Sequence, residues 1–232
     1  MSIFIIGDIH GCSLALGALL EKLRSDPAAD SLIFLGDLFD RGPDSWGVWQ
    51  AVRVLAGQYG ERLTLLRGNH EDYLLSKHLS IRERMTWDRV GRGATVRSFR
   101  EHGQKMEDAV PWLQEHCRLY TRLGEIQCVH AGLLVDPLEA NDTFTLVHDH
   151  MAAFMNRYAG PLTVTGHIAL PEPTWFPGSG EPTEHLPRGT WLDLPDRGII
   201  CIDTGCGKGG ELTAMTVEGG RFLLTSVPER AV

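Results

Sequence analysis

Six residues with metal-binding side chains end or directly follow short apolar runs of this 232-residue chain. In chain order they are Asp8, His10, Asp37, Asn69, His130 and His167. If the apolar runs are strands of an open α/β sheet, side chains at their carboxyl ends meet at one edge, where such sheets bind ligands. A mixed set of carboxylates and imidazoles suits Mn²⁺, Fe or Zn²⁺. The set is larger than one ion needs, so we expect two divalent metal ions, with Mn²⁺ as the first choice.

The spacing of the acidic residues also fits a two-metal centre. Asp8 and His10 lie two positions apart on an extended segment, so their side chains point the same way and can bind one ion. The stretch GDLFDRG at 36–42 brings Asp37, Asp40 and Arg41 together after the next apolar run. Such crowded carboxylates are tolerated if Asp37 bridges two cations, which lie about 3.5–4 Å apart in two-metal hydrolases.

Apolar runs alternate with helical stretches in the first half of the chain, which predicts a largely parallel sheet covered by helices. We expect strands at 2–6, 31–35 and 62–66, and helices at 14–25, 45–60 and 69–79. Residues 80–117 are charged and helical, and we interpret them as an insertion or cap. Further on, we expect strands at 119–123, 125–130 and 161–166, a helix at 143–157, a long surface loop at 171–189, and antiparallel strands at 198–203, 211–217 and 221–227.

Composition excludes several classes of protein. The net charge is −8, and the absence of a dense Lys/Arg run argues against a dedicated nucleic-acid partner. No apolar stretch approaches the roughly 18–20 residues of a membrane helix, and the N-terminus lacks the basic region of a signal peptide. We therefore expect a cytoplasmic protein. Its five cysteines are an odd number without metal-site spacing, so we expect reduced, mostly buried thiols.

The motifs together resemble those of the PPP-type metallophosphoesterases, within the calcineurin-like phosphoesterase superfamily. This branch includes bacterial and phage protein serine/threonine phosphatases and the symmetrical diadenosine tetraphosphatases. The matching motifs are GDIHG at 7–11, GDLFDRG at 36–42, GNHE at 68–71, HAG at 130–132, GH at 166–167 and the tail at 202–214. The resemblance implies one domain over 1–232, folded as a four-layer α/β/β/α sandwich with the dimetal site at the carboxyl ends of its strands.

The resemblance also implies roles for individual residues. Asp8, His10 and Asp37 would bind the first metal, and Asp37, Asn69, His130 and His167 the second. A hydroxide bridging the metals would attack phosphorus directly. The catalytic residues would be His70, which protonates the leaving oxygen, Asp40, which orients it, and Arg41, which holds phosphate oxygens together with Asn69.

The chain departs from the family pattern between HAG and GH. Family protein phosphatases carry a second phosphate-binding Arg there, whereas this interval contains only Arg157. His148 or His150 could stand in its place, although a neutral imidazole binds phosphate more weakly than a guanidinium. Arg84, Arg89 or Arg92 of the helical insertion could also replace it. We interpret 148–150 as surface helix rather than as an extra metal site, and Trp175 and Phe176 as anchors of the 171–189 loop.

Three functions remain open at this point. The first is a dimetal phosphatase for phosphomonoesters, which acts on phosphoserine or phosphothreonine in proteins. The alternative is a dinucleoside polyphosphate hydrolase or a small-molecule phosphatase; base stacking would then need an aromatic ring near the pocket, such as Trp87, Trp112, Trp175 or Phe176. The third is a catalytically weak protein that binds phosphorylated partners. The expected partner is a phosphorylated protein or a small phosphoester, with no nucleic acid and no membrane, and the oligomeric state is open.

Overall fold

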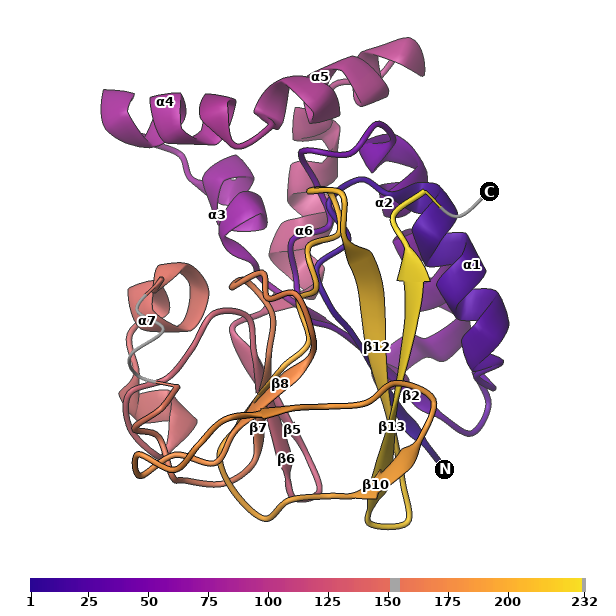
Figure 1. The fold of residues 1–232 in the computed structure, drawn as a ribbon. Coiled ribbons are helices and arrows are strands. Elements are labelled where there is room, and N and C mark those ends of the chain that lie inside the picture. Colours follow the sequence, from indigo (N-terminus) through magenta and orange to yellow (C-terminus); the bar gives the residue numbers. More distant parts are fainter. Residues whose placement is uncertain (151–154, 231–232) are drawn as a thin grey trace.

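The computed structural model describes residues 1–150 and 155–230, which form two β-sheets flanked by helices (Figure 1). The first sheet has the strand order β10-β13-β12-β1-β2-β3-β4. Its strands are β1 (Ile3–Ile6), β2 (Ser31–Phe34), β3 (Leu63–Leu66), β4 (Cys117–Arg118), β10 (Trp191–Asp193), β12 (Glu211–Glu218) and β13 (Arg221–Pro228). β1 to β4 are mutually parallel, and β12 joins β1 in antiparallel register. The parallel part thus has the predicted β-α-β order.

The second sheet has the order β5-β6-β7-β11-β8-β9. Its strands are β5 (Tyr120–Leu123), β6 (Ile126–Val129), β7 (Thr163–Thr165), β8 (Thr174–Phe176), β9 (Glu184–His185) and β11 (Ile199–Cys201). The central strands β6, β7 and β11 are parallel to one another. Both sheets therefore bring the carboxyl ends of parallel strands to an edge where side chains can meet.

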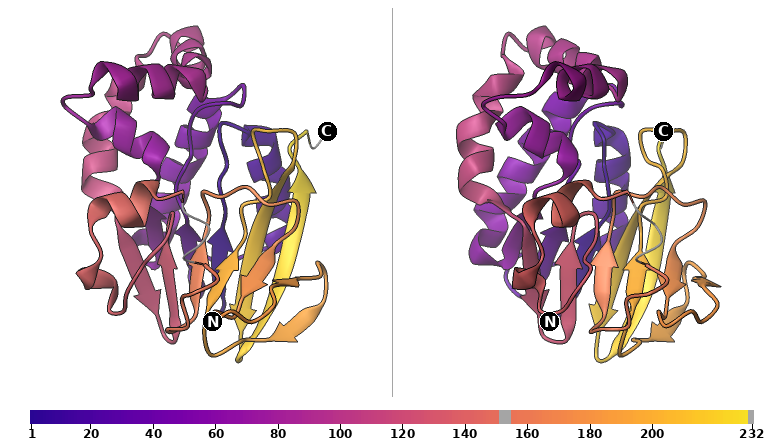
Figure 2. Two further views of the ribbon diagram at one scale, coloured as in Figure 1. Left: turned by 60° about the vertical axis from the view of Figure 1, so that its left-hand side comes forward. Right: turned by 90° about the vertical axis from the view of Figure 1, so that its left-hand side faces the viewer.

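The helices are α1 (Ser13–Leu23), α2 (Ser45–Tyr59), α3 (Asn69–Leu75), α4 (Ile81–Arg89), α5 (Arg92–Glu101), α6 (Val110–His116) and α7 (Thr143–His148). Single 3₁₀ turns occur at Gly60–Arg62, Met106–Ala109 and Leu138–Ala140. Residues 80–117, which were expected to be helical, contain α4, α5, one of these 3₁₀ turns and α6, and β4 begins at Cys117. Helices α4 and α5 lie above the ends of the strands in all three views (Figures 1 and 2). Within the described ranges, no helix has the length and apolar character needed to cross a membrane.

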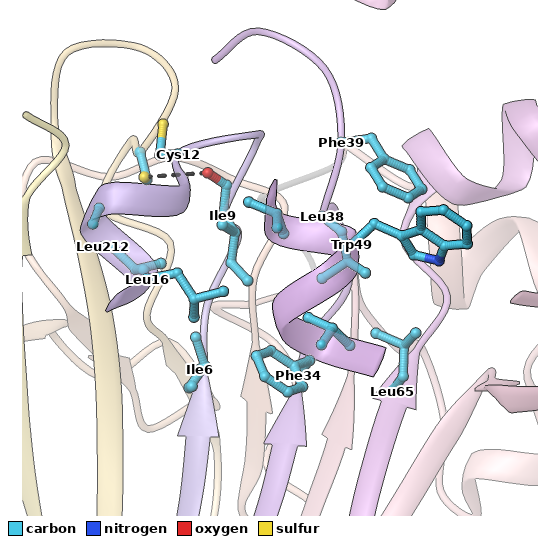
Figure 3. Packing of buried hydrophobic residues seen from close by; sticks show 14 of the residues in the cluster. Ile6, Ile9, Cys12, Leu16, Phe34, Leu38, Phe39, Trp49, Leu65 and Leu212 are labelled. Carbon is cyan, nitrogen blue, oxygen red and sulfur yellow. Dashed lines mark hydrogen bonds between the residues drawn. The ribbon is translucent and has the colours of Figure 1, made fainter. Parts of the chain in front are cut away.

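Three apolar clusters separate the four layers. In the first, Ile6, Phe34 and Leu65 of the first sheet pack against Leu16 of α1 and Trp49 of α2 (Figure 3). A second cluster fills the space between the sheets, and it includes Ile33, Leu66, Val164, Ile200 and Met215. A third places α7 on the outer face of the second sheet, through Val129, Leu146, Val147 and Ile199. The predicted four-layer α/β/β/α architecture is confirmed.

Three expectations from the sequence need correction. The run 198–203 does not join the antiparallel C-terminal strands, because β11 lies in the second sheet, parallel to β7. It is buried on both faces, which is typical of a parallel strand and hides the pairing direction from sequence. Segment 171–189 is not loop throughout, since it contains β8 and β9. The helix expected at 143–157 ends at His148, and residues 151–154 lie outside the described part.

Candidate active site

The predicted site residues lie where the backbone bends sharply after its strands. His10, Asp37, Asp40, Arg41 and His167 have φ angles of 46°, 51°, 70°, 67° and 66°. These are five of the seven non-glycine residues with positive φ in the described part of the chain. For a residue other than glycine, such a conformation costs about 1–3 kcal/mol. It persists where the surrounding structure holds the backbone in place, which is common at functional sites. The strain is concentrated at the edge where the motifs converge.

Asp8, His10, Asp37 and His70 form the first group of this edge. Nε2 of His10 lies 3.9 Å from Asp8 Oδ2 and 3.5 Å from Asp37 Oδ2, and Nε2 of His70 lies 3.8 Å from Asp37 Oδ2. All four residues are almost fully buried. Oδ1 of Asp8 and Nε2 of His70 have no hydrogen-bond partner. Nδ1 of His10 donates to the carbonyl of Phe39 at 2.9 Å, which leaves the Nε2 lone pair for a cation.

Asp37, Asn69, His130 and His167 form the second group. Nε2 of His130 lies 3.5 Å from Asp37 Oδ1, 3.2 Å from Asn69 Oδ1 and 3.1 Å from His167 Nδ1. Nδ1 of His130 donates to the carbonyl of Leu35 at 2.8 Å, so Nε2 presents a lone pair to this group. Several electron-rich atoms thus converge without enough protons to join them as hydrogen bonds. Such donors fit a cation, and Asp37 belongs to both groups.

The electrostatics of the buried cluster favour the same conclusion. Burial lowers the pKa of His130, and burial and the neighbouring His130 lower the pKa of His167 to about 2, so both imidazoles are neutral. Burial raises the pKa of Asp37, whereas the charge that His130 and then His70 carry when protonated lowers it, and the lowering is larger. Burial, then Asp203 and Asp37, raise the pKa of Asp8. A cation would relieve this repulsion and be held by neutral imidazoles.

His70 is oriented by a carboxylate that the helical segment holds in place. Nδ1 of His70 lies 2.6 Å from Oδ2 of Asp40. Trp87 Nε1 of α4 donates to the same oxygen at 2.6 Å, and Thr95 Oγ1 of α5 donates to Oδ1 at 2.6 Å. Burial would lower the pKa of His70, but Asp37 and Asp40 outweigh it and raise it. The family resemblance predicted the roles of His70 and Asp40, but it gave none to Thr95, and Trp87 was considered only as a base-stacking ring and not as a donor to Asp40.

Glu71 shapes the backbone beneath the metal ligands, another role the sequence analysis did not assign. Its buried carboxylate accepts backbone N–H groups from Asp37 at 2.7 Å, Leu38 at 2.9 Å and Gly68 at 3.0 Å. Burial and then the neighbouring Asp37 raise the pKa of this carboxyl to about 7. The signal available in the sequence was the glutamate three residues after Gly68, whose side chain accepts the backbone N–H of the N-cap residue at the start of α3. Glu71 thereby ties the second and third strand ends together.

Arg41, Asn69, His70, His150 and His167 line one pocket of about 260 Å³, so the predicted substrate-binding residues share it. Arg41 also contacts Nε2 of His10. The His150 ring stacks on that of His167, with centroids 4.2 Å apart. Burial and then His148 lower the pKa of His150, and Lys208 acts in the same direction. Lys208 also lines the pocket, and the sequence analysis had not singled it out.

The other candidate residues lie away from this pocket or are engaged elsewhere. Arg92 binds Asp88 at 3.1 Å and covers one face of the Trp87 indole, while Tyr73 stacks against that ring. Trp87 is also buried, so its ring is not open to a base. Arg84, Arg89 and Trp112 do not line the pocket. Trp175 donates to the carbonyl of Arg197 and Phe176 is buried in the third apolar cluster, as expected of loop anchors. Nε2 of His148 binds Asp72 at 2.8 Å at the end of α7, and a metal cluster at 148–150 does not occur in the described structure.

Comparisons with known proteins agree with this geometry. A family model described as "Calcineurin-like phosphoesterase" matches residues 1–200. The chain is 26% identical to the symmetrical bis(5'-nucleosyl)-tetraphosphatase of Pectobacterium carotovorum, over 97% of this chain and 95% of that protein. It is 29% identical to serine/threonine-protein phosphatase 1 of Salmonella typhimurium, over 93% of this chain and 92% of that one.

A solved structure gives the same fold. The metallophosphoesterase of Sphaerobacter thermophilus superposes with a TM-score of 0.64, covering 98% of this chain and 88% of its own, at 21% identity. Its likeness concerns the fold, whereas the family model also covers the five polar strand ends that carry all six of the converging residues. The chain therefore belongs to the calcineurin-like phosphoesterases, a family of metal-dependent hydrolases that act on phosphoester bonds.

Proposed function

We propose that this protein is a two-metal phosphomonoesterase that acts on phosphoserine and phosphothreonine in proteins. The observation that carries the proposal is the pair of ligand groups that share Asp37 beside the His70–Asp40 pair and Arg41. Metal binding, a general acid and a phosphate-binding cation then meet in one pocket. A protein that only binds phosphorylated partners has no need of the buried His70–Asp40 pair.

The proposed metal ligands follow from the two groups. Asp8, His10 and Asp37 hold one ion, and Asp37, Asn69, His130 and His167 hold the other. When bound, two divalent cations supply an activated water and neutralise charge on the phosphoryl oxygens. Manganese is our first choice for the mixed carboxylate and imidazole donors, ahead of iron and zinc. We further propose that residues 1–232 form one domain, with 80–117 as an insertion above the site.

The residues around the metal ligands complete the proposed chemistry. Nε2 of His70 is buried, has no partner and faces the pocket side of Asp37, so it can donate a proton to the leaving oxygen. Asp40 holds the other ring nitrogen and stabilises the imidazolium before the transfer. Arg41 offers a planar fork to phosphate oxygens, and the Asn69 side chain lies beside it in the pocket.

Chain length favours a protein substrate over a dinucleotide. The alignment with the Pectobacterium tetraphosphatase extends over 278 positions, more than the 232 residues of this chain, so it requires insertions that this chain lacks. The alignment with the Salmonella protein phosphatase extends over 223 positions. The pocket of about 260 Å³ is also small for a dinucleoside tetraphosphate, and Trp87 is buried and does not line it. Dinucleoside tetraphosphate hydrolysis is the second candidate, favoured by the name of the Pectobacterium relative.

The test is metal-dependent turnover of chelator-stripped protein. We would add Mn²⁺ and compare a phosphoserine peptide, a phosphotyrosine peptide, p-nitrophenyl phosphate and diadenosine tetraphosphate, with Asp37→Asn as the control for contaminating phosphatases. The proposal expects the highest kcat/KM on the phosphoserine peptide. A preference for the dinucleotide would replace the proposed substrate by the second candidate. If the protein binds two metals but hydrolyses none of the four compounds, the proposed phosphatase function is refuted and phospho-binding is favoured.

A further inference from the structure

The pocket above the proposed metal ligands contains two permanently charged cations, counted among the residues that the structure describes. One is Arg41, and the other is Lys208 of the glycine-rich segment between β11 and β12. The two come from opposite ends of the sequence, so no local motif connects them. The interval between residues 132 and 166, where the family carries its second phosphate-binding Arg, contains only Arg157, which does not line this pocket. Lys208 is thus the second cation that the fold brings to this place.

The backbone around Lys208 explains why it lies so close to the site. Gly207 has a φ of +79°, and a Cβ added there would lie 2.6 Å from Cβ of His10 and 3.2 Å from Cβ of Arg41. A glycine is needed at this position, because the segment runs directly against a proposed metal ligand and the phosphate-binding arginine. Lys208, the next residue, therefore lies at the rim of the pocket.

The same segment is held in one shape by hydrogen bonds. The backbone N–H groups of Lys208 and Gly210 both donate to the carbonyl of Gly205, at 2.9 and 3.0 Å. The buried thiol of Cys206 donates to the carbonyl of Ile9, at 3.3 Å, next to His10. The backbone under Lys208 is therefore fixed relative to the metal ligands. Only its side chain is free to move, and binding a substrate requires no ordering of the loop.

The charge of Lys208 is available for a ligand, unlike the charges of Arg92 and Arg67. Lys208 is exposed, and no carboxylate of the described residues forms an ion pair with it within 4.0 Å. Arg92 is engaged by Asp88, and Arg67 by Asp72 at 3.3 Å. The ring of His150 is stacked on His167. Among the candidates for the missing arginine, Lys208 alone combines a permanent charge, a place in the pocket and no ion pair within 4.0 Å among the described residues, although its charge also acts on the buried Asp203.

We infer that Lys208 is the second phosphate-binding cation of this site and that it holds phosphoryl oxygens together with Arg41. This inference rests on the proposed phosphatase function. As a compact, hydrated point charge on a flexible stem, an ammonium binds phosphate without the fixed two-pronged geometry of arginine. Lys208 therefore contributes mainly to ground-state binding of the phosphate group, and loss of its charge raises KM and phosphate inhibition constants more than it lowers kcat.

The test measures equilibrium binding of inorganic phosphate to the Mn²⁺-loaded full-length protein by calorimetry, for Lys208→Ala and Lys208→Arg. Removal of one charge-assisted contact at a solvent-exposed rim is expected to weaken phosphate binding about 5- to 20-fold. Lys208→Arg should remain within about twofold of the original protein, because the charge is kept. Lys105→Ala is the matched control, since it removes an exposed lysine that does not line the pocket. Thermal melting of each variant checks that the fold is kept.

The outcomes separate this inference from the proposed function. An unchanged dissociation constant in Lys208→Ala, with weaker binding in Arg41→Ala, would overturn the role of Lys208 and leave the phosphatase intact. Equal weakening by Lys208→Ala and Lys105→Ala would also overturn it, because the effect would then come from net charge. If the metal-loaded original protein binds no phosphate at all, both the proposed function and the inference built on it fail. Selective weakening by Lys208→Ala, restored by Lys208→Arg, supports the assignment.

Discussion

The replacement Trp87→Phe tests whether the helical segment controls the chemistry from outside the motifs. It keeps a ring between Tyr73 and Arg92 but removes the N–H group that donates to Asp40 Oδ2 at 2.6 Å. Asp40 is fully buried, so water does not replace this donor. A hydrogen bond to a charged group is worth about 1.5–3 kcal/mol. If this whole free energy is lost from stabilisation of the transition state, kcat drops by roughly 10- to 150-fold.

The assay compares kcat for a phosphoserine peptide and for p-nitrophenyl phosphate. Because Asp40 acts through His70, the loss should be larger for serine, a poor leaving group that needs the proton, than for p-nitrophenolate. In a His70→Asn background, Trp87→Phe should cause no further loss, since its route to the reaction is already removed. Trp112→Phe is the matched control, because that ring stacks on His116 of the same helix and does not line the pocket.

Two results would refute the reasoning. Equal losses on both substrates would mean that Trp87 does not act through the general acid. A further loss in the His70→Asn background would show that Trp87 supports the site by another route, such as the placement of α4. Metal content measured alongside should stay unchanged, because Trp87 touches no proposed ligand.

Three further predictions concern the ligands, the acid and the link between α3 and α7. Asp37→Asn should abolish turnover and lower the metal content measured by mass spectrometry; full metal occupancy with normal activity would contradict the bridging role. His70→Asn should lower kcat on the phosphoserine peptide by roughly 10²–10⁴-fold, and a loss under threefold in stopped assays would rule out general acid catalysis. Burial would raise the pKa of Asp72, but hydrogen bonds from His148 and Arg67 outweigh it and lower the pKa below the ordinary 3.8. A depressed carboxyl pKa stabilises the fold above pH 3.8, and this contribution disappears as pH falls through the folded-state pKa. Asp72→Asn should thus cost about 1 kcal/mol in urea unfolding at pH 7 and much less once the pH is below the folded-state pKa of Asp72, and a pH-independent difference would contradict it.

Most of the parallel framework could be predicted from the sequence because its signals are local. The runs before Asp8, Asp37 and Asn69 became β1, β2 and β3, and the helix after Asp44 ends at Tyr59, before Gly60, as its pattern indicated. Polar residues placed directly after apolar runs indicated the converging edge. These features depend on residues within a few positions of each other, which is the range over which side-chain periodicity and turn chemistry act.

Features that depend on long-range pairing escaped prediction. The direction of β11 depends on partners in the second sheet, and its run, buried on both faces, carries no sign of them. The strands β8 and β9 inside 171–189 are only three and two residues long and also depend on those partners. Trp87, Thr95 and Lys208 have ordinary sequence surroundings. They gain their significance from Asp40 and Arg41, which are at least 46 positions away along the chain.

The sequence by itself indicated the side chains that we propose as metal ligands, the proposed general acid and its carboxylate partner, because each follows a strand within its own motif. The tertiary structure alone decided that Asp37 stands between two groups of ligands, that Glu71 ties two strand ends together, and that Lys208 faces the phosphate pocket. Residue types and spacing limit which chemistry is possible. Distances between distant segments arise only when the sheets pack and bury their shared core.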